Sequence, residues 1–324
     1  MELAGLSFTG IVLCVIIGIA LDLALGEARR LHPLVGFGTL AIWVEGKLNH
    51  AAASRLTGLL AWCIVVLPLV AVVQIIVILA IRFNPWLGAA LHAVVLYFCV
   101  GLRSLHEHTA PIQAALEAGN LEDARQLTSM IVSRDNAQAE EQDISKAAVE
   151  SLLENGCDAV FGAIFWFVVA GGAGAVLYRL SNTLDAMWGY RTSRFLKFGC
   201  AAARIDDGLN WIPARLTALS YAALGNTRLA WQCWRKQAPQ WSSPNAGPVM
   251  SAGAGALELA LGGAAIYDGV LEQRPLLGEG KPALAKDIQR AWRLVFNASL
   301  LWTGVLFLVA VAKILNALNG SAHA

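Results

Sequence analysis

The chain has 324 residues, of which 57% are hydrophobic and 15% charged, and its formal net charge is +1. A mean hydropathy of +0.57 excludes an ordinary soluble globular protein, and the near-neutral charge gives no electrostatic basis for nucleic-acid binding. The six cysteines form no C-x-x-C pair, so neither a disulfide framework nor a zinc site is expected. The composition therefore indicates an integral membrane protein.

Apolar runs predict membrane-spanning helices at 6–25, 57–81 and 87–102, because about 20 apolar residues cross a bilayer core. The segment 26–55 between the first two runs is basic. It holds Arg29, Arg30, Lys47 and Arg55. The positive-inside rule places such a segment on the cytoplasmic side, and the short turn near Arg82 outside.

The segment 103–158 is polar and helical in pattern, and its end carries a series of acids. Glu150, Glu154 and Asp158 are four residues apart and therefore lie along one face of a helix. Because three like charges repel one another, we expect a cationic partner opposite this face. A solvated face without a ligand is the alternative.

A fourth apolar run at 159–180 is interrupted at Gly171-Gly172. If this run crossed the membrane completely, the basic residues of 181–204 would face outward, against the positive-inside rule. We therefore expect a re-entrant hairpin that folds back at Gly171-Gly172. A small-residue helix packed against a neighbour is the alternative.

Beyond this run, 231–241 is polar and aromatic, 245–263 reads as a close-packed helix, and 297–318 is the last clear span. These elements predict an all-α integral membrane protein of one domain, 1–324. It has about four full transmembrane helices plus a re-entrant or broken helical hairpin around a polar cavity that faces the cytoplasm. Acids and arginines gather between 133 and 217, and ionised groups beside hydrocarbon usually serve a substrate or an ion. Ordinary solvated helix ends are the alternative.

A set of motifs follows one order along the chain. They are Asp22…His32-Pro33…Gly36, Ser133-Arg134-Asp135, Glu150-Ser151-x-x-Glu154-Asn155-x-x-Asp158, Asn182-Thr183-Leu184-Asp185-x-Met187-x-Gly189-Tyr190, Arg204-x-Asp206-Asp207-x-x-Asn210-x-x-Pro213-Ala214-Arg215, Asn245-Ala246-Gly247, Leu261-Gly262-Gly263, Tyr267 and Leu277-Gly278. In these motifs the chain resembles the CobD/CbiB family of cobamide biosynthesis. It departs from the family pattern at Ala159, where a glycine is usual.

The resemblance implies an adenosylcobinamide-phosphate synthase in the bacterial inner membrane, with its active site facing the cytoplasm. The implied reaction joins the free propionate carboxylate of adenosylcobyric acid to the amine of (R)-1-amino-2-propanol or its O-phosphate. It implies ATP and Mg²⁺, although the chain has neither a Walker A motif nor a Rossmann fingerprint. The implied partners are these substrates, the lipid bilayer and other membrane enzymes of late cobamide assembly.

The residue types then predict roles within this reaction. Carboxylates suit Mg²⁺, guanidinium groups bind phosphate and carboxylate through two bonds, and a glutamate can accept the proton of an amine. The candidate catalytic residues are Glu150, Glu154, Arg134 and Arg215; the candidate metal ligands are Asp158, Asp185, Asp206 and Asp207; the candidate substrate-binding residues are Ser133, Asp135, Asn155, Asn182, Tyr190, Arg204, Asn210 and Asn245.

Two other functions are consistent with the pattern. The acids at Asp185 and Asp206-Asp207 are similar to those of Mg²⁺-dependent intramembrane prenyltransferases, although no further Asp continues the series after Asp185. A non-catalytic signalling protein of the AmpE type would share the architecture.

Overall fold

The computed structural model describes residues 5–28, 32–50, 53–267 and 269–322, and 77% of the chain is helical. Contacts divide it into two compact units. Unit 1 contains Met1–Gly101, Gly162–Leu209 and Leu301–Ala324, and unit 2 contains Leu102–Phe161 and Asn210–Leu300. The single domain expected over 1–324 stays a prediction. Arg29 and Arg30 lie outside the described residues.

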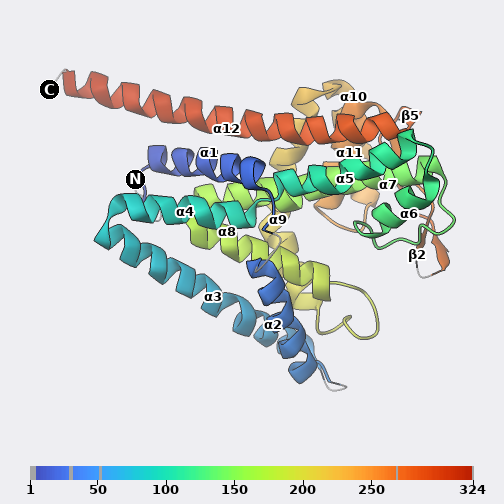
Figure 1. Cartoon of the computed structure of the whole chain (residues 1–324), viewed down its shortest axis with the longest axis horizontal. Coiled ribbons are helices and arrows are strands. Elements are labelled where there is room, and N and C mark those ends of the chain that lie inside the picture. The colour runs from blue at the N-terminus through green and yellow to red at the C-terminus, as the bar shows by residue number, and fades with distance from the viewer. Residues whose placement is uncertain (1–4, 29–31, 51–52, 268, 323–324) are drawn as a thin grey trace. The chain divides into compact units, whose positions relative to one another are not determined.

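Among the described residues of unit 1, the regular elements are helices (Figure 1). They are α1 (Phe8–Leu25), α2 (Pro33–Leu48), α3 (Arg55–Phe83), α4 (Pro85–Cys99), α8 (Gly162–Trp188), the first part of α9 (Cys200–Leu224) and the last part of α12 (Ala285–Ala322). Its core is aromatic and aliphatic. Trp62, Trp188 and Phe198 are buried together there, and the rings of Trp188 and Phe198 meet edge to face at 5.0 Å.

Helix α8 confirms the expected fold-back. Ala170 (φ −139°, ψ 19°) and Gly171 (φ 64°, ψ −154°) leave the helical conformation, and the positive φ explains a glycine at this point. A Cβ on Gly174 would lie 2.3 Å from the carbonyl oxygen of Trp166, whereas eight residues of straight helix span about 12 Å. The two limbs of α8 therefore run back along each other.

A histidine from a neighbouring helix stabilises this turn. The break leaves the N–H of Gly172 without a helical partner, and this group donates to Nδ1 of buried His92 on α4 at 2.9 Å. A backbone polar group at membrane depth needs such a partner, because hydrocarbon offers none. His92 therefore has a structural role, which is to satisfy the backbone at the turn of α8.

The two ends of unit 1 carry different segments. At one end, the chain near Gly5 approaches Ile81 of α3, and Lys313 of α12 lies 4.2 Å from the ring centroid of Phe8. At the other end, Glu45 at the end of α2 pairs with Arg194, and Gly58 near the start of α3 meets the backbone of Phe198. The basic segments 26–55 and 181–204 thus share one end of unit 1, as the sequence predicted.

Unit 2 contains shorter helices and the strands of the chain. They are α5 (Leu102–Glu117), α6 (Leu121–Ser129), α7 (Glu141–Gly156), a π-helical turn (Cys157–Phe161), the rest of α9, α10 (Thr227–Gln237), a 3₁₀ turn (Ala238–Gln240), α11 (Ala246–Leu257), the first part of α12, and the strands β1 (Leu259–Gly262), β2 (Ala265–Tyr267), β3 (Val270–Glu272), β4 (Leu276–Leu277) and β5 (Lys281–Pro282).

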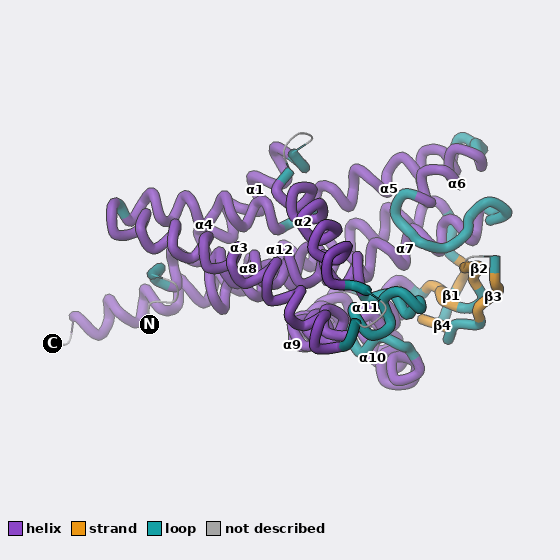
Figure 2. Tube along the Cα trace, turned by 90° about the horizontal axis from the view of Figure 1, so that it is seen from below, coloured by secondary structure: helices purple, strands orange, loops and turns teal. Residues whose placement is uncertain are grey.

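The strands correct one expectation. The helix predicted over 245–263 ends at Leu257, because Glu258 takes a left-handed conformation (φ 58°) and β1 follows. β1 lies between β4, which is antiparallel to it, and β5, which is parallel, while β2 and β3 form a separate hairpin. Figure 2 shows these strands, in orange, gathered beside the loops of unit 2.

Within the described residues, five helical segments are long and apolar enough to cross a membrane. They are Phe8–Leu25, Arg55–Phe83, Pro85–Glu117, Glu141–Trp188 and Ala285–Asn319. The fourth contains the turn of α8, so the spans and the broken hairpin are both present. The chain is an all-α membrane protein with a small amount of sheet.

Candidate functional site

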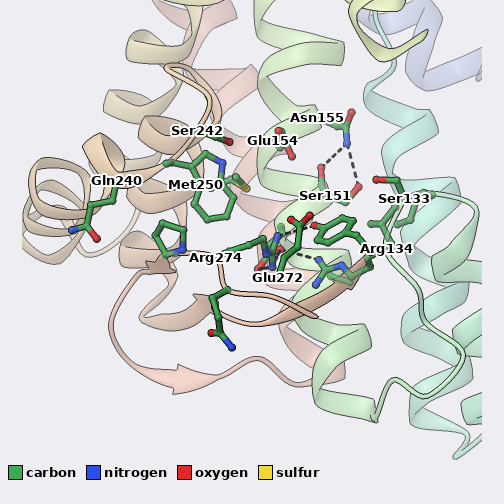
Figure 3. Close-up of a pocket in the computed structure, with 18 residues that line it drawn as sticks. Ser133, Arg134, Ser151, Glu154, Asn155, Gln240, Ser242, Met250, Glu272 and Arg274 are labelled. Carbon is green, nitrogen blue, oxygen red and sulfur yellow. Dashed lines mark hydrogen bonds and ion pairs between the residues drawn. The ribbon is translucent and has the colours of Figure 1, made fainter. Parts of the chain in front are cut away.

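A polar cavity of about 550 Å³ lies in unit 2, where α7, the loop before it and the strand region meet (Figure 3). The sequence-predicted residues Ser133, Arg134, Glu150, Glu154 and Asn155 all line it. These residues come from two of the motifs that carry the family resemblance. The structure therefore brings Ser133-Arg134 and the 150–155 segment together around one space.

Glu150 is the centre of a buried ion network in this cavity. Its side chain is 5% exposed, and its Oε2 accepts from Arg134 at 2.8 Å and from Arg274 at 3.1 Å. Its Oε1 accepts the backbone N–H of Gly262 at 2.7 Å. The cationic partner that the acid series predicted is thus a pair of arginines. Because both carboxylate oxygens are engaged, these contacts favour a positioning role for Glu150 over proton transfer.

Arg134 is fixed by its neighbours in the loop. The N–H of Asp135 donates to the carbonyl of Ile266 on β2 at 2.8 Å, and the Asp135 carboxylate accepts from the N–H of Ala137. The Arg134 side chain is 7% exposed, and its Nε has no hydrogen-bond partner among the described residues. A buried N–H donor beside a cavity can be satisfied by an oxyanion of a ligand.

Arg274 is a site residue that sequence reasoning missed. Besides Glu150, it donates to Tyr267 at 3.3 Å and to the carbonyl of Gly263 at 3.3 Å, and its guanidinium lies 5.5 Å from the ring centroid of Trp241. An isolated arginine before a proline has no periodic signal. The one available signal was its position in the sequence, between the motif residues Tyr267 and Leu277-Gly278.

The exposed wall of the cavity adds further acids and hydroxyls. Glu154 lies one helical turn beyond Glu150, and Glu272 of β3 lines the cavity from the strand region (Figure 3). The amide of Asn155 donates to the carbonyl and the hydroxyl of Ser151, at 2.9 and 3.2 Å. This wall presents carboxylates close to the arginine pair, an arrangement that suits a ligand with both charges.

Other predicted residues of unit 2 lie outside this cavity. Asp158 belongs to the π-helical turn after α7, a distortion that is frequent at functional sites. Asn210 is buried and accepts from the Cys157 thiol at 3.7 Å. Arg215 donates to the side chain of Asn245 at 2.8 Å, so the structure joins these two predicted residues directly.

The remaining candidates form a second polar cluster in unit 1. Asn182 on α8 donates to Asp206 on α9 at 3.3 Å. Asp185 lies within electrostatic range of Asp207. Burial raises the pKa of the Asp207 carboxyl, and the nearby Arg191 opposes this shift. Adjacent Asp206 and Asp207 thus meet different partners.

Two predicted binding residues of unit 1, Tyr190 and Arg204, are exposed. In the described part of the chain, no group of three or more His, Cys, Asp or Glu is arranged to hold a metal ion. Asp185 and Asp207 lie within electrostatic range of each other, and proteins usually hold Mg²⁺ through one or two carboxylates completed by water and phosphate. The metal role of Asp158, Asp185, Asp206 and Asp207 stays a prediction.

Comparison with known proteins agrees with the motifs. The CobD/Cbib protein family matches residues 15–295. A cobalamin biosynthesis protein CobD of Stutzerimonas stutzeri is 54% identical over 91% of this chain and 96% of its own length. Proteins of the same name from Chromobacterium violaceum (47%; 95% and 97%) and Rhodobacter capsulatus (38%; 91% and 96%) are also similar. No solved structure matches significantly. The chain belongs to the CobD/CbiB family.

Proposed function

We propose that this protein acts in cobalamin biosynthesis, as the membrane enzyme that joins an amino alcohol to adenosylcobyric acid. The relatives carry the name of that pathway, and they cover nearly the whole chain. The observation that carries the chemical proposal is the cavity of unit 2. There the pair of Arg134 and Arg274 around buried Glu150 lies beside the carboxylates of Glu154 and Glu272.

The reaction forms an amide between (R)-1-amino-2-propanol, or its O-phosphate, and the free propionate carboxylate of adenosylcobyric acid. A carboxylate does not react with an amine at neutral pH, because an oxide is a very poor leaving group. Transfer of a phosphoryl group from ATP to a carboxylate oxygen releases ADP and gives an acyl phosphate, whereas transfer of a nucleotidyl group releases diphosphate and gives an acyl adenylate. The amine then displaces phosphate or AMP to form the amide. We therefore propose an ATP-dependent acid–amine ligase.

The cavity offers groups for each part of this reaction. A guanidinium fork matches the two oxygens of a carboxylate or phosphate, and Arg134 keeps a buried Nε donor for such a bond. Glu154 is the candidate to orient the attacking amine and accept its proton, because Glu150 is occupied by two arginines and Gly262. Desolvation inside the cavity would strengthen both contacts.

Mg²⁺ is part of the proposal through the acids of unit 1. Asp185 and Asp207, with Asp206 beside them, are the acids that would hold it, and the ion would supply positive charge there. Asn182 orients Asp206 through the bond described above, so the amide fixes one acid of this cluster.

The orientation of the chain follows from its charges. Lys47, Arg55, Arg194 and Lys197 belong to the segments that share one end of unit 1. Basic residues gather on the cytoplasmic side of bacterial membrane proteins. We therefore propose that this end faces the cytoplasm, with the protein in the inner membrane.

Complementation tests the function. A bacterial strain that lacks the cobinamide-forming step is given either cobyric acid or cobinamide, and corrinoid-dependent growth is scored. The gene should restore growth on cobyric acid, while cobinamide should support growth with or without it. If the protein accumulates in the membrane but the strain grows only when cobinamide is supplied, and not on cobyric acid, the proposal is contradicted. A signalling or prenyl-transfer role would then be favoured.

A further inference from the structure

A second cavity of about 460 Å³ lies in unit 2 beside the first one, and Trp241 and Ser242 line both. Three indoles, two arginines and three prolines contribute to its lining. The function proposed above leaves this cavity without a role. A space of this size is within the range of small-molecule sites, about 300–1,000 Å³.

Helix α10 places part of this lining on one face. Trp231, Trp234 and Arg235 stand at helical spacings of three and four, so their side chains lie on neighbouring surfaces of α10. The indoles of Trp231 and Trp234 meet edge to face at 5.3 Å. The end of α10 is fixed by Gln237, whose amide exchanges two hydrogen bonds with the backbone of Gly278, at 2.7 and 3.1 Å. The aromatic wall is therefore anchored.

Arg215 of α9 supplies charge to the same cavity. Its guanidinium donates to Asn245 at 2.8 Å and to the carbonyl of Pro244 at 3.0 Å, and it lies 4.5 Å from the ring centroid of Trp211. These contacts orient the Arg215 guanidinium, and because both acceptors are uncharged they leave its positive charge uncompensated. Burial lowers the pKa of Arg215, which is the direction expected for a cation that loses water and gains no carboxylate.

The two cavities differ in charge. The first is lined by two arginines and three glutamates, a formal net charge of −1. The second is lined by Arg215 and Arg235 and by no acid, a formal net charge of +2. Among the described residues, neither of these arginines has a carboxylate within 4.0 Å. The second cavity is therefore the better match for an anion with a flat apolar part.

We infer that this second cavity binds ATP, with the adenine against the indoles of α10 and a phosphate toward Arg215 and Arg235. The inference deepens the proposed function, because it rests on the need for ATP in amide formation. Base stacking on aromatic side chains is strong and needs no sequence motif. The shared wall at Trp241 and Ser242 puts the nucleotide next to the cavity where the amide would form.

Kinetics and photolabelling of the full-length protein in lipid nanodiscs test this assignment. Arg235→Gln and Trp234→Leu change the cavity, while Arg228→Gln on the same helix and Trp86→Leu in unit 1 are matched controls with exposed side chains. We expect the KM for ATP to rise about tenfold in the two cavity variants, as for one lost charge-assisted bond or one stacked base. The KM values for the amine and the corrinoid should stay unchanged, and the controls should behave as the parent protein.

Irradiation with 8-azido-ATP should label peptides from 227–248, and ATP should protect them. Labelling elsewhere, with an unchanged KM for ATP and ATP-dependent synthesis, would overturn the cavity assignment and leave the proposed function standing. Synthesis without ATP would overturn both. A lipid-headgroup site would show a different pattern: the variants would lose binding to phosphatidylglycerol vesicles while their KM for ATP stayed normal. That result would also overturn the assignment.

Discussion

Replacement of Glu150 by glutamine separates a positioning role from a catalytic one. The substitution keeps the size of the side chain and its ability to accept the N–H of Gly262, but it removes the charge between Arg134 and Arg274. The Arg134 and Arg274 side chains are only 7% and 14% exposed, so water cannot readily replace the lost carboxylate. Removing one partner of a buried ion pair costs about 3–5 kcal/mol.

We therefore expect Glu150→Gln to lower the thermal midpoint of the purified protein in detergent by roughly 10 °C. Glu154→Gln, one turn further along the same cavity, is the matched comparison. It should lower the midpoint less than Glu150→Gln does and lose turnover, since Glu154 is the proposed proton acceptor. Both variants are measured for melting and for cobinamide synthesis. A Glu150→Gln protein that melts like the parent and has lost all turnover would refute the positioning role.

Three further outcomes follow from the side-chain contacts described above. Arg215→Lys should lower kcat/KM about ten- to a hundredfold, because an ammonium cannot replace the guanidinium fork; this corresponds to about 1.5–3 kcal/mol. Arg194→Gln should lower the thermal midpoint only slightly, since Arg194 is largely exposed. The Arg194 hydrogen bond lowers the pKa of Glu45, so this stability is present above the ordinary pKa of a glutamate and disappears as pH falls through the lowered one. Melting at pH 7 should therefore distinguish variant from parent, and melting in acid below the lowered pKa should not. In a cysteine-free background, a cysteine at Thr192 should resist an impermeant reagent applied to intact cells, while one at Phe83 should react; labelling of the first would reverse the proposed orientation.

Much of unit 1 could be predicted because hydrophobic length is a local signal. The runs at 57–81 and 297–318 lie within helices of the structure, and α1 (Phe8–Leu25) covers all but the first two residues of the run at 6–25. A pair of glycines with a basic segment after it predicted the turn in α8. That turn is required by two independent constraints, charge on the following segment and backbone freedom at Gly171. Agreement between such constraints is what makes a local pattern specific.

The centre of the site could be predicted only in half. The acid series on α7 required a cationic partner, and Arg134 was named as a candidate for the site. Arg274 was not predicted as a site residue, because it is 124 residues from Glu150 in the sequence. It is brought close to Glu150 by strands that the sequence did not predict. Those strands are two to four residues long, and a segment so short has no measurable alternation of polar and apolar residues.

The charges of the two adjoining cavities explain how one unit could receive substrates of opposite sign. An amine entering as a cation is attracted to the cavity that holds Glu154 and Glu272, and a polyphosphate is attracted to the cavity that holds Arg215 and Arg235. Glu150 is essential to this separation. By pairing with both arginines of the first cavity, it lowers the attraction of that cavity for a polyphosphate and leaves the Arg134 Nε donor for the propionate carboxylate. We therefore propose that the buried ion network sorts ligands by charge, in addition to holding the loop and the strands together.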